Sequence, residues 1–173
     1  MLISGGVAVI TGDEAGFDAF VAGRQAALSR TAYLLTGDHH LAQDLVQAAL
    51  LQAARHWTRI HTSPEAYVRR AMYHQNISWW RRRRFAESPL LGHDGTADAV
   101  DTDLRLTLDQ ALARLTAKQR TVLVLRFYED LTEVESARAL GVSVGTAKST
   151  TRHALGRLRT LAPELAELIG ADA

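Results

Sequence analysis

The chain has 173 residues, enough for one domain or two small ones, and its apolar and charged residues are interspersed, which favours a globular protein. No cysteine is present, which excludes disulfides, iron–sulfur clusters and thiol nucleophiles and argues against a small secreted fold. The apolar stretch at the amino terminus is too short to span a membrane and lacks signal-peptide flanks. We therefore expect a cytoplasmic protein with no membrane partner.

The net charge of +1 hides an uneven distribution along the chain. Residues 1–85 carry 10 basic and 6 acidic side chains, whereas residues 86–103 carry 5 acidic and no basic ones. Residues 104–173 are basic again, with 10 basic and 8 acidic side chains. This pattern favours two modules that contact nucleic acid and an acidic linker that does not bind it in the same way.

Helical periodicity dominates and strand patterns are almost absent, so the predicted class is all-α. A first helix is expected from about Glu14 to Leu35, with an inward face of Phe17, Phe20, Leu28, Ala32 and Leu35. Asp38 is expected to cap a second helix that extends to about Trp57. The apolar stripe of that helix follows helical spacing and consists of Ala42, Leu45, Val46, Ala49, Leu50, Ala53 and Trp57.

A different face of the second helix carries four residues at steps of three and four, namely Asp44, Gln47, Leu51 and Arg55. An isolated exposed leucine is normal on a protein surface. Beside an acid and an amide on one ridge, Leu51 also fits a protein docking surface. The residues alone leave both interpretations open.

The third helix is expected to begin at Ser63 and Pro64 and to continue to about Phe85, ending in SWWRRRR. The four arginines suit phosphates, and the adjacent aromatic rings suit stacking on unpaired bases. The alternative is a solvated helix end whose cations match the negative end of the helix dipole. We favour nucleic acid.

Two further expectations concern the side-chain directions on this helix. His74, Ser78 and Arg81 share one face by their spacing. Trp79 lies seven residues after Met72 on the expected buried stripe, so we assign Trp79 to the core and Trp80 to the nucleic-acid surface.

After the acidic segment 86–103, which reads as a flexible linker, helical pattern resumes at Leu104. Thr116 and Gln119 form a predicted capping box. Pro163 is expected to end the final long helix.

Residues 131–158 have the pattern of a helix-turn-helix. Thr132 and Glu135 form a capping box, and Gly141 stands where the chain needs a left-handed residue. The apolar stripe of the first helix is Val134, Ala137 and Leu140, and that of the second, capped by Ser143, is Ala147, Thr151, Ala154, Leu155 and Leu158. The opposite, polar face of the second helix is Thr146, Lys148, Ser149, Arg152 and His153. Such a helix usually enters the DNA major groove, although a helical hairpin in another all-α protein shares the pattern.

Over about Phe17–Phe85 and Leu104–Leu161, the chain resembles bacterial RNA polymerase sigma factors of the extracytoplasmic-function (group IV) type, in their SigE-like actinobacterial subfamily. The matching motifs are LTGDHHLAQDLVQAAL, YVRRAMYHQNISWWRRRR and LGVSVGTAKSTTRHAL. The resemblance implies two small helical domains joined by a flexible acidic linker. They are a sigma2-like bundle over residues 1–85 and a sigma4-like helix-turn-helix domain over residues 104–173.

By this resemblance, Asp44 and Gln47, with Leu51 and Arg55 nearby, bind the clamp of the polymerase largest subunit. The minus-ten promoter element is recognised and opened by His74, Ser78, Trp80, Arg81, Arg82, Arg83 and Arg84. The minus-thirty-five element is read by Thr146, Lys148, Ser149, Arg152 and His153. In the family the linker threads the RNA exit channel.

Three residues depart from the family pattern. His74 stands where the family commonly has asparagine, Ala147 replaces a valine, and His153 replaces an arginine that is displaced to Arg152. These departures concern the minus-ten preference, the packing of the recognition helix and the phosphate contacts.

The expected function is a sigma factor that binds core RNA polymerase and directs it to promoter DNA. No catalytic constellation, phosphate-binding glycine loop or metal-ligand spacing is found, so no enzyme activity, metal or cofactor is expected. One alternative is a stand-alone helix-turn-helix regulator, and another is a sigma-like protein that binds polymerase without melting DNA. We expect a monomer when the protein is free, and the sequence leaves open whether an anti-sigma factor binds it.

Overall fold

The computed structural model describes residues 14–61, 63–86 and 102–163, without the side chains of residues 84–86 and 102–107. Regular structure in these ranges is entirely helical, as predicted. The long helices are α1 (Glu14–Thr36), α2 (His39–His56), α3 (Pro64–Ala86), α4 (Thr102–Ala113), α5 (Ala117–Leu123), α6 (Glu133–Leu140) and α7 (Val144–Leu161). A short 3-10 turn, η1 (Trp57–Arg59), follows α2, and a π-helical turn, η2 (Val124–Tyr128), follows α5.

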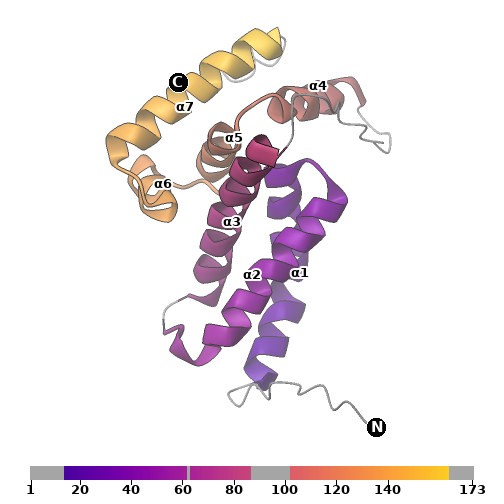
Figure 1. Ribbon diagram of the computed structural model, residues 1–173, viewed down its shortest axis with the longest axis vertical. Coiled ribbons are helices and arrows are strands. Elements are labelled where there is room, and N and C mark those ends of the chain that lie inside the picture. Colours follow the sequence, from indigo (N-terminus) through magenta and orange to yellow (C-terminus); the bar gives the residue numbers. More distant parts are fainter. Residues whose placement is uncertain (1–13, 62, 87–101, 164–173) are drawn as a thin grey trace.

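Helices α1, α2 and α3 lie side by side as a three-helix bundle (Figure 1). The predicted cap of α2 is present, because Oδ1 of Asp38 accepts a hydrogen bond from the Leu41 amide at 2.8 Å. Gly37 has a φ of 73° and allows the tight connection from α1. The bundle encloses a first core of Leu28, Ala32, Leu35, Ala42, Leu45, Val46, Ala49, Ala53, Val68, Ala71, Met72 and Tyr73.

Helices α4 to α7 form the second domain, at one side of the bundle (Figure 1). Both predicted capping boxes are complete, with Thr116 paired to Gln119 and Thr132 paired to Glu135. Gly141 ends α6 in the left-handed conformation with a φ of 67°. The second core consists of Ala111, Leu112, Leu115, Val122, Leu123, Ala154, Leu158 and Ala162.

The predicted apolar stripe of α6 is wrong at its first residue. Val134 is 52% exposed, whereas Ser136 and Ala137 are buried. Helix α6 packs against α7, α3 and η2, so its buried side faces several neighbours rather than one. Leu140 contacts both cores for the same reason.

The two domains share the first core, which the sequence did not indicate. Val124 and Leu125 belong to the turn η2 of the second domain, yet they are buried in the same cluster as the bundle residues. Contacts of α5 and α6 with α3 extend this interface. In the free chain, the two domains are therefore packed against each other.

The acidic segment lies largely outside the described residues, which omit 87–101. The two ends of the predicted linker are helical, because α3 includes Ala86 and α4 begins at Thr102. None of the helices within the described ranges combines the length and apolar character needed to cross a membrane.

Candidate nucleic-acid and protein interfaces

The face of α2 that the sequence singled out is exposed. Asp44, Gln47 and Arg55 are all exposed, and Leu51 has 54% of its surface accessible. The opposite face of the same helix supplies Ala42, Leu45, Val46, Ala49 and Ala53 to the first core. Since the core does not use these four residues, they are available to a partner.

The arginine run at the end of α3 adjoins this face. Arg82 and Arg83 are exposed and line a pocket of about 290 Å³ together with Asp44, Leu41 and Trp79. Trp79 also packs against the first core, as expected. Among the described residues, Trp80 is half-buried and belongs to neither core, Arg81 is exposed, and the Arg84 side chain lies outside the described part.

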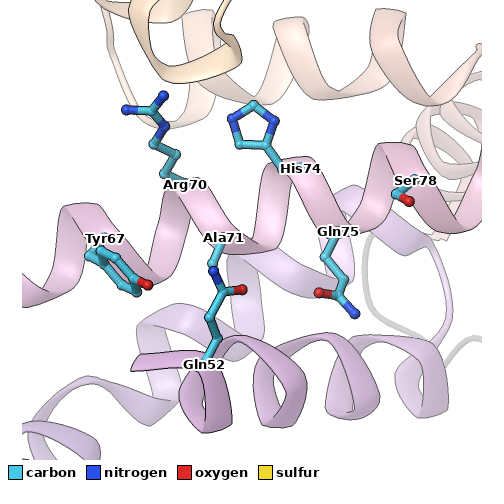
Figure 2. A pocket seen from close by; sticks show the side chains of 7 residues that line it. All are labelled: Gln52, Tyr67, Arg70, Ala71, His74, Gln75 and Ser78. Carbon is cyan, nitrogen blue, oxygen red and sulfur yellow. The ribbon is translucent and has the colours of Figure 1, made fainter. Parts of the chain in front are cut away.

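A larger open pocket of about 530 Å³ lies along α3 and beside α2 (Figure 2). It brings the predicted residues His74 and Ser78 together with five residues that the sequence reasoning missed, namely Gln52, Tyr67, Arg70, Ala71 and Gln75. Arg70, His74 and Ser78 follow one another at steps of four and so lie on one ridge of the helix. This spacing was the signal in the sequence that could have identified Arg70. In Figure 2, Arg70 and His74 point away from α2, whereas Gln52 and Gln75 lie between the two helices.

Asn76 does not stand in for the asparagine that the family has near His74. The Asn76 side chain is 1% exposed, and its amide donates to the Leu35 carbonyl at 3.4 Å, at the end of α1. It therefore serves the bundle and is not available to a base. His74 is exposed and Gln75 lines the pocket.

The polar face of α7 is open at its amino-terminal end. Thr146, Lys148, Arg152 and His153 are exposed, and half-buried Ser149 donates its hydroxyl to the Thr146 carbonyl at 3.1 Å. Lys148 Nζ lies 3.3 Å from Glu133 Oε2 on α6, a surface ion pair. Such pairs are weak in water, so Lys148 can exchange Glu133 for a phosphate. The predicted buried stripe of α7 is confirmed, with Leu155 only half-buried.

Tyr73 is a buried phenol between the two domains. Burial raises the pKa of Tyr73 above its ordinary value, and the negative charge of Glu129 raises it further, whereas Arg69 opposes the shift. An acid that stays neutral in the folded state contributes stability below its unfolded pKa of about 10 and loses that contribution as the pH rises.

We expect native Tyr73 to ionise only after the structure opens at alkaline pH. Tyrosinate absorbance should be recorded over an alkaline pH series for the protein and for Tyr73→Phe, with circular dichroism at each pH. The difference between the two curves is the titration of Tyr73. A difference curve that rises at the pH of free tyrosine, while the helices are intact, would contradict the described burial.

No group of three histidine, aspartate or glutamate side chains in the described ranges is arranged to hold a metal ion.

Two segments of the chain match known protein families. Residues 20–86 match the family "Sigma-70 region 2" and residues 111–160 match "Sigma-70, region 4". The chain is 41% identical over 154 residues to the RNA polymerase sigma-E factor of Streptomyces coelicolor, with 86% of each chain covered. It is 32% identical over 150 residues to the ECF RNA polymerase sigma factor SigL of Mycobacterium tuberculosis, covering 81% of this chain and 85% of that one.

Solved structures show the same fold at lower identity. The sigma factor RpoE of Bartonella quintana, in complex with the anti-sigma factor NepR, is 22% identical with a TM-score of 0.65, over 91% of this chain and 99% of that one. CnrH, in complex with the cytosolic domain of CnrY, is 22% identical with a TM-score of 0.59, over 95% of this chain and 94% of that one. These likenesses concern the fold. The two region matches and the Streptomyces relative place the chain in the sigma-70 family, as a SigE-like sigma factor of the extracytoplasmic-function group.

Proposed function

We propose that each exposed face of this sigma factor has a separate role in transcription initiation. The α2 face of Asp44, Gln47, Leu51 and Arg55 binds the polymerase clamp. The α3 surface from His74 to the arginine run captures the minus-ten element, and the polar face of α7 reads the minus-thirty-five element. The bundle is thus the polymerase-binding and melting domain, and residues from Leu104 onward form the upstream DNA-binding domain.

The match of residues 20–86 to sigma-70 region 2 carries this proposal, because it gives the amino-terminal half a role. A stand-alone helix-turn-helix regulator needs only the carboxy-terminal half and leaves SWWRRRR without a use. We infer that the protein acts with polymerase as a promoter-specificity subunit without enzyme activity of its own. Its site of action is then the cytoplasm, where polymerase transcribes.

The proposal is tested by transcription in vitro with actinobacterial core RNA polymerase and fragmented genomic DNA. Mapping the 5′ ends of the transcripts should reveal start sites that require the protein and share two upstream sequence elements. If the protein binds DNA tightly alone and leaves polymerase output unchanged, it is a stand-alone regulator. If it binds core polymerase and yields no new start sites, it is a polymerase-binding protein without melting activity.

The clamp-binding face gives a direct prediction. Asp44→Ala combined with Gln47→Ala should weaken binding to core polymerase by at least about tenfold, because truncating one partner of a desolvated hydrogen-bonded pair leaves the other partner unpaired. Both residues are exposed, so the fold should be unaffected. The affinity for core polymerase is measured by pull-down or fluorescence anisotropy, and folding is measured by circular dichroism.

The matched control is Asp18→Ala combined with Gln25→Ala, which removes the same side-chain types from exposed positions on α1. This control should bind polymerase normally. If the two double variants bind core polymerase with equal affinity, the docking site does not lie on this face of α2.

Anti-sigma proteins are proposed as further partners. Two of the structural neighbours are described in complexes, RpoE with the anti-sigma factor NepR and CnrH with the cytosolic domain of CnrY. At 22% identity these show the shared fold, and the identity of any such partner here follows from co-purification with the tagged chain.

A further inference from the structure

We propose that Glu133 is an internal competitor of DNA: its carboxylate occupies Lys148 in the absence of DNA and thereby lowers the affinity of the second domain for the phosphate backbone. A phosphate has to displace this carboxylate before it can bind Lys148. The inference rests on the proposed function of the polar face of α7, and it assigns a role to a residue of α6, outside that face.

The ion pair between Glu133 and Lys148 joins the two helices of the helix-turn-helix. Glu133 is the first residue of α6, and its Oε2 lies 3.3 Å from Nζ of Lys148 in the second turn of α7. Helices α6 and α7 pack against each other, so the two backbones that carry the pair are held together. The side chain of Lys148 is 62% exposed and that of Glu133 is 36% exposed. The pair is therefore open to water, and its partners can exchange.

The neighbouring carboxylate of α6, that of Glu135, has a different role. Its Oε2 accepts hydrogen bonds from the Thr132 amide at 2.8 Å and from the Thr132 hydroxyl at 2.7 Å. These hydrogen bonds lower the pKa of Glu135 below its ordinary value. Since Thr132 and Glu135 complete the capping box, the cap of α6 does not use the Glu133 side chain, and that carboxylate is directed to Lys148.

The effect of Glu133 on the polar face of α7 is a loss of positive charge. This face carries two permanent cations, Lys148 and Arg152. Within the described part of the chain, Lys148 is the one of the two that forms an ion pair with a carboxylate. Glu133 thus offsets half of the formal charge that the face presents to a phosphate backbone. Each cation that neutralises a phosphate releases counterions and strengthens binding to DNA of any sequence, so this offset weakens such binding.

The consequence is greatest for DNA that is not a promoter. Phosphate contacts supply essentially all of the binding of a protein to unrelated DNA, and a genome offers about 10⁶ to 10⁹ such sites. At a promoter, contacts with base edges add to the phosphate contacts. The loss of one phosphate contact is therefore a smaller share of the total binding there. Glu133 in this way reduces the amount of protein that is held on unrelated DNA.

Binding of the full-length chain to a fluorescent DNA duplex of unrelated sequence tests the competition without polymerase or a promoter. In anisotropy measurements at low salt, Glu133→Gln should tighten binding about threefold, the size of one surface ion pair. The plot of log affinity against log salt concentration should steepen by up to about one unit, because Lys148 then contacts a phosphate more of the time. Glutamine keeps the size of the side chain, so circular dichroism should show an intact fold.

A double-mutant cycle tests whether Glu133 acts through Lys148. Lys148→Ala should weaken binding to the duplex, and Glu133→Gln should have no further effect in that background, because the lysine that it would release is gone. The matched control is Asp130→Asn, which removes the same charge three residues earlier at an exposed position. Asp130 has a φ of 53°, in the left-handed region that asparagine also adopts, so this control should fold and bind DNA like the parent.

The possible outcomes separate the competition from the proposed function. If Asp130→Asn tightens binding as much as Glu133→Gln, net charge accounts for the effect and the competition is overturned. If Glu133→Gln tightens binding equally with and without Lys148, Glu133 repels DNA directly, which also overturns it. If Lys148→Ala weakens binding and Glu133→Gln leaves it unchanged, the competition fails while the proposed role of α7 stands. If Lys148→Ala has no effect on binding, the competition and the assignment of Lys148 to DNA fail together.

Discussion

Replacing Trp80 with alanine is expected to reduce promoter opening by about tenfold or more while sparing the closed promoter complex. Stacking of a base on an aromatic ring contributes about 1–3 kcal/mol, and capturing an unpaired base costs a similar amount, so melting is nearly balanced and sensitive to one ring. Trp80 is half-buried and belongs to neither core among the described residues, so its ring is free for this use. Permanganate reactivity of unpaired thymines reports opening, and a gel shift reports the closed complex.

Trp79→Ala is the matched comparison, since it removes the same side chain from the adjacent position. Trp79 packs against the first core, so its loss should lower the free energy of unfolding by about 2 kcal/mol. Chemical denaturation separates this effect from a defect in melting. If Trp80→Ala unfolds the protein and only Trp79→Ala reduces promoter melting, the roles of the two rings are reversed. If both variants melt promoter DNA normally, α3 does not capture bases.

The second large effect is expected at the minus-thirty-five face. Lys148→Ala combined with Arg152→Ala should weaken binding of the polymerase holoenzyme to promoter DNA by at least about tenfold, because charge-assisted contacts to phosphate are lost. The dependence of affinity on salt should flatten by about two units of logarithmic slope, one for each phosphate contact. Footprinting over a salt series measures both quantities.

Lys118→Ala combined with Arg159→Ala removes the same two charges from exposed positions away from the amino-terminal end of α7. This control should retain the parental slope. Since Lys148 is paired with Glu133 at 3.3 Å, Glu133→Gln is a further useful variant and should leave DNA binding equal or stronger. If the Lys148 and Arg152 double variant keeps the parental dependence of affinity on salt, these residues do not contact DNA phosphates.

Local signals in the sequence predicted the elements well because they act within a few residues. The capping boxes at Thr116 and Thr132 and the left-handed Gly141 each need only neighbouring side chains or backbone, and all three are present. The exposed face of α2 followed from the same helical spacing that placed Leu45 and Ala49 in the core. The prediction for Val134 was wrong because the orientation of a short helix depends on every neighbour, and α6 contacts α3, α7 and η2.

The interface between the domains could not be predicted from such signals. Arg69 and Glu129 lie 60 positions apart, and nothing in the residues between them marks the pair. In the sequence, Arg120 is one more basic residue on an amphipathic helix. Only the structure shows that it lies beside the end of α1, where it donates a hydrogen bond to the Leu34 carbonyl. Pairing across such distances is decided by packing of whole elements, and Val124 and Leu125 fit the core of either domain by composition alone.

The shared core limits how this chain can be dissected. A fragment that ended at Ala86 would keep α1, α2 and α3 but would present to water the apolar surface that Val124 and Leu125 cover in the whole chain. Uncovered surface of this kind promotes self-association and lowers solubility. A chimera in which the carboxy-terminal module comes from a related protein would inherit the same defect unless the donor supplied residues that fit this site. Grafting α7 alone, from Ser143 onward, would exchange promoter specificity and leave Val124 and Leu125 in place on the bundle.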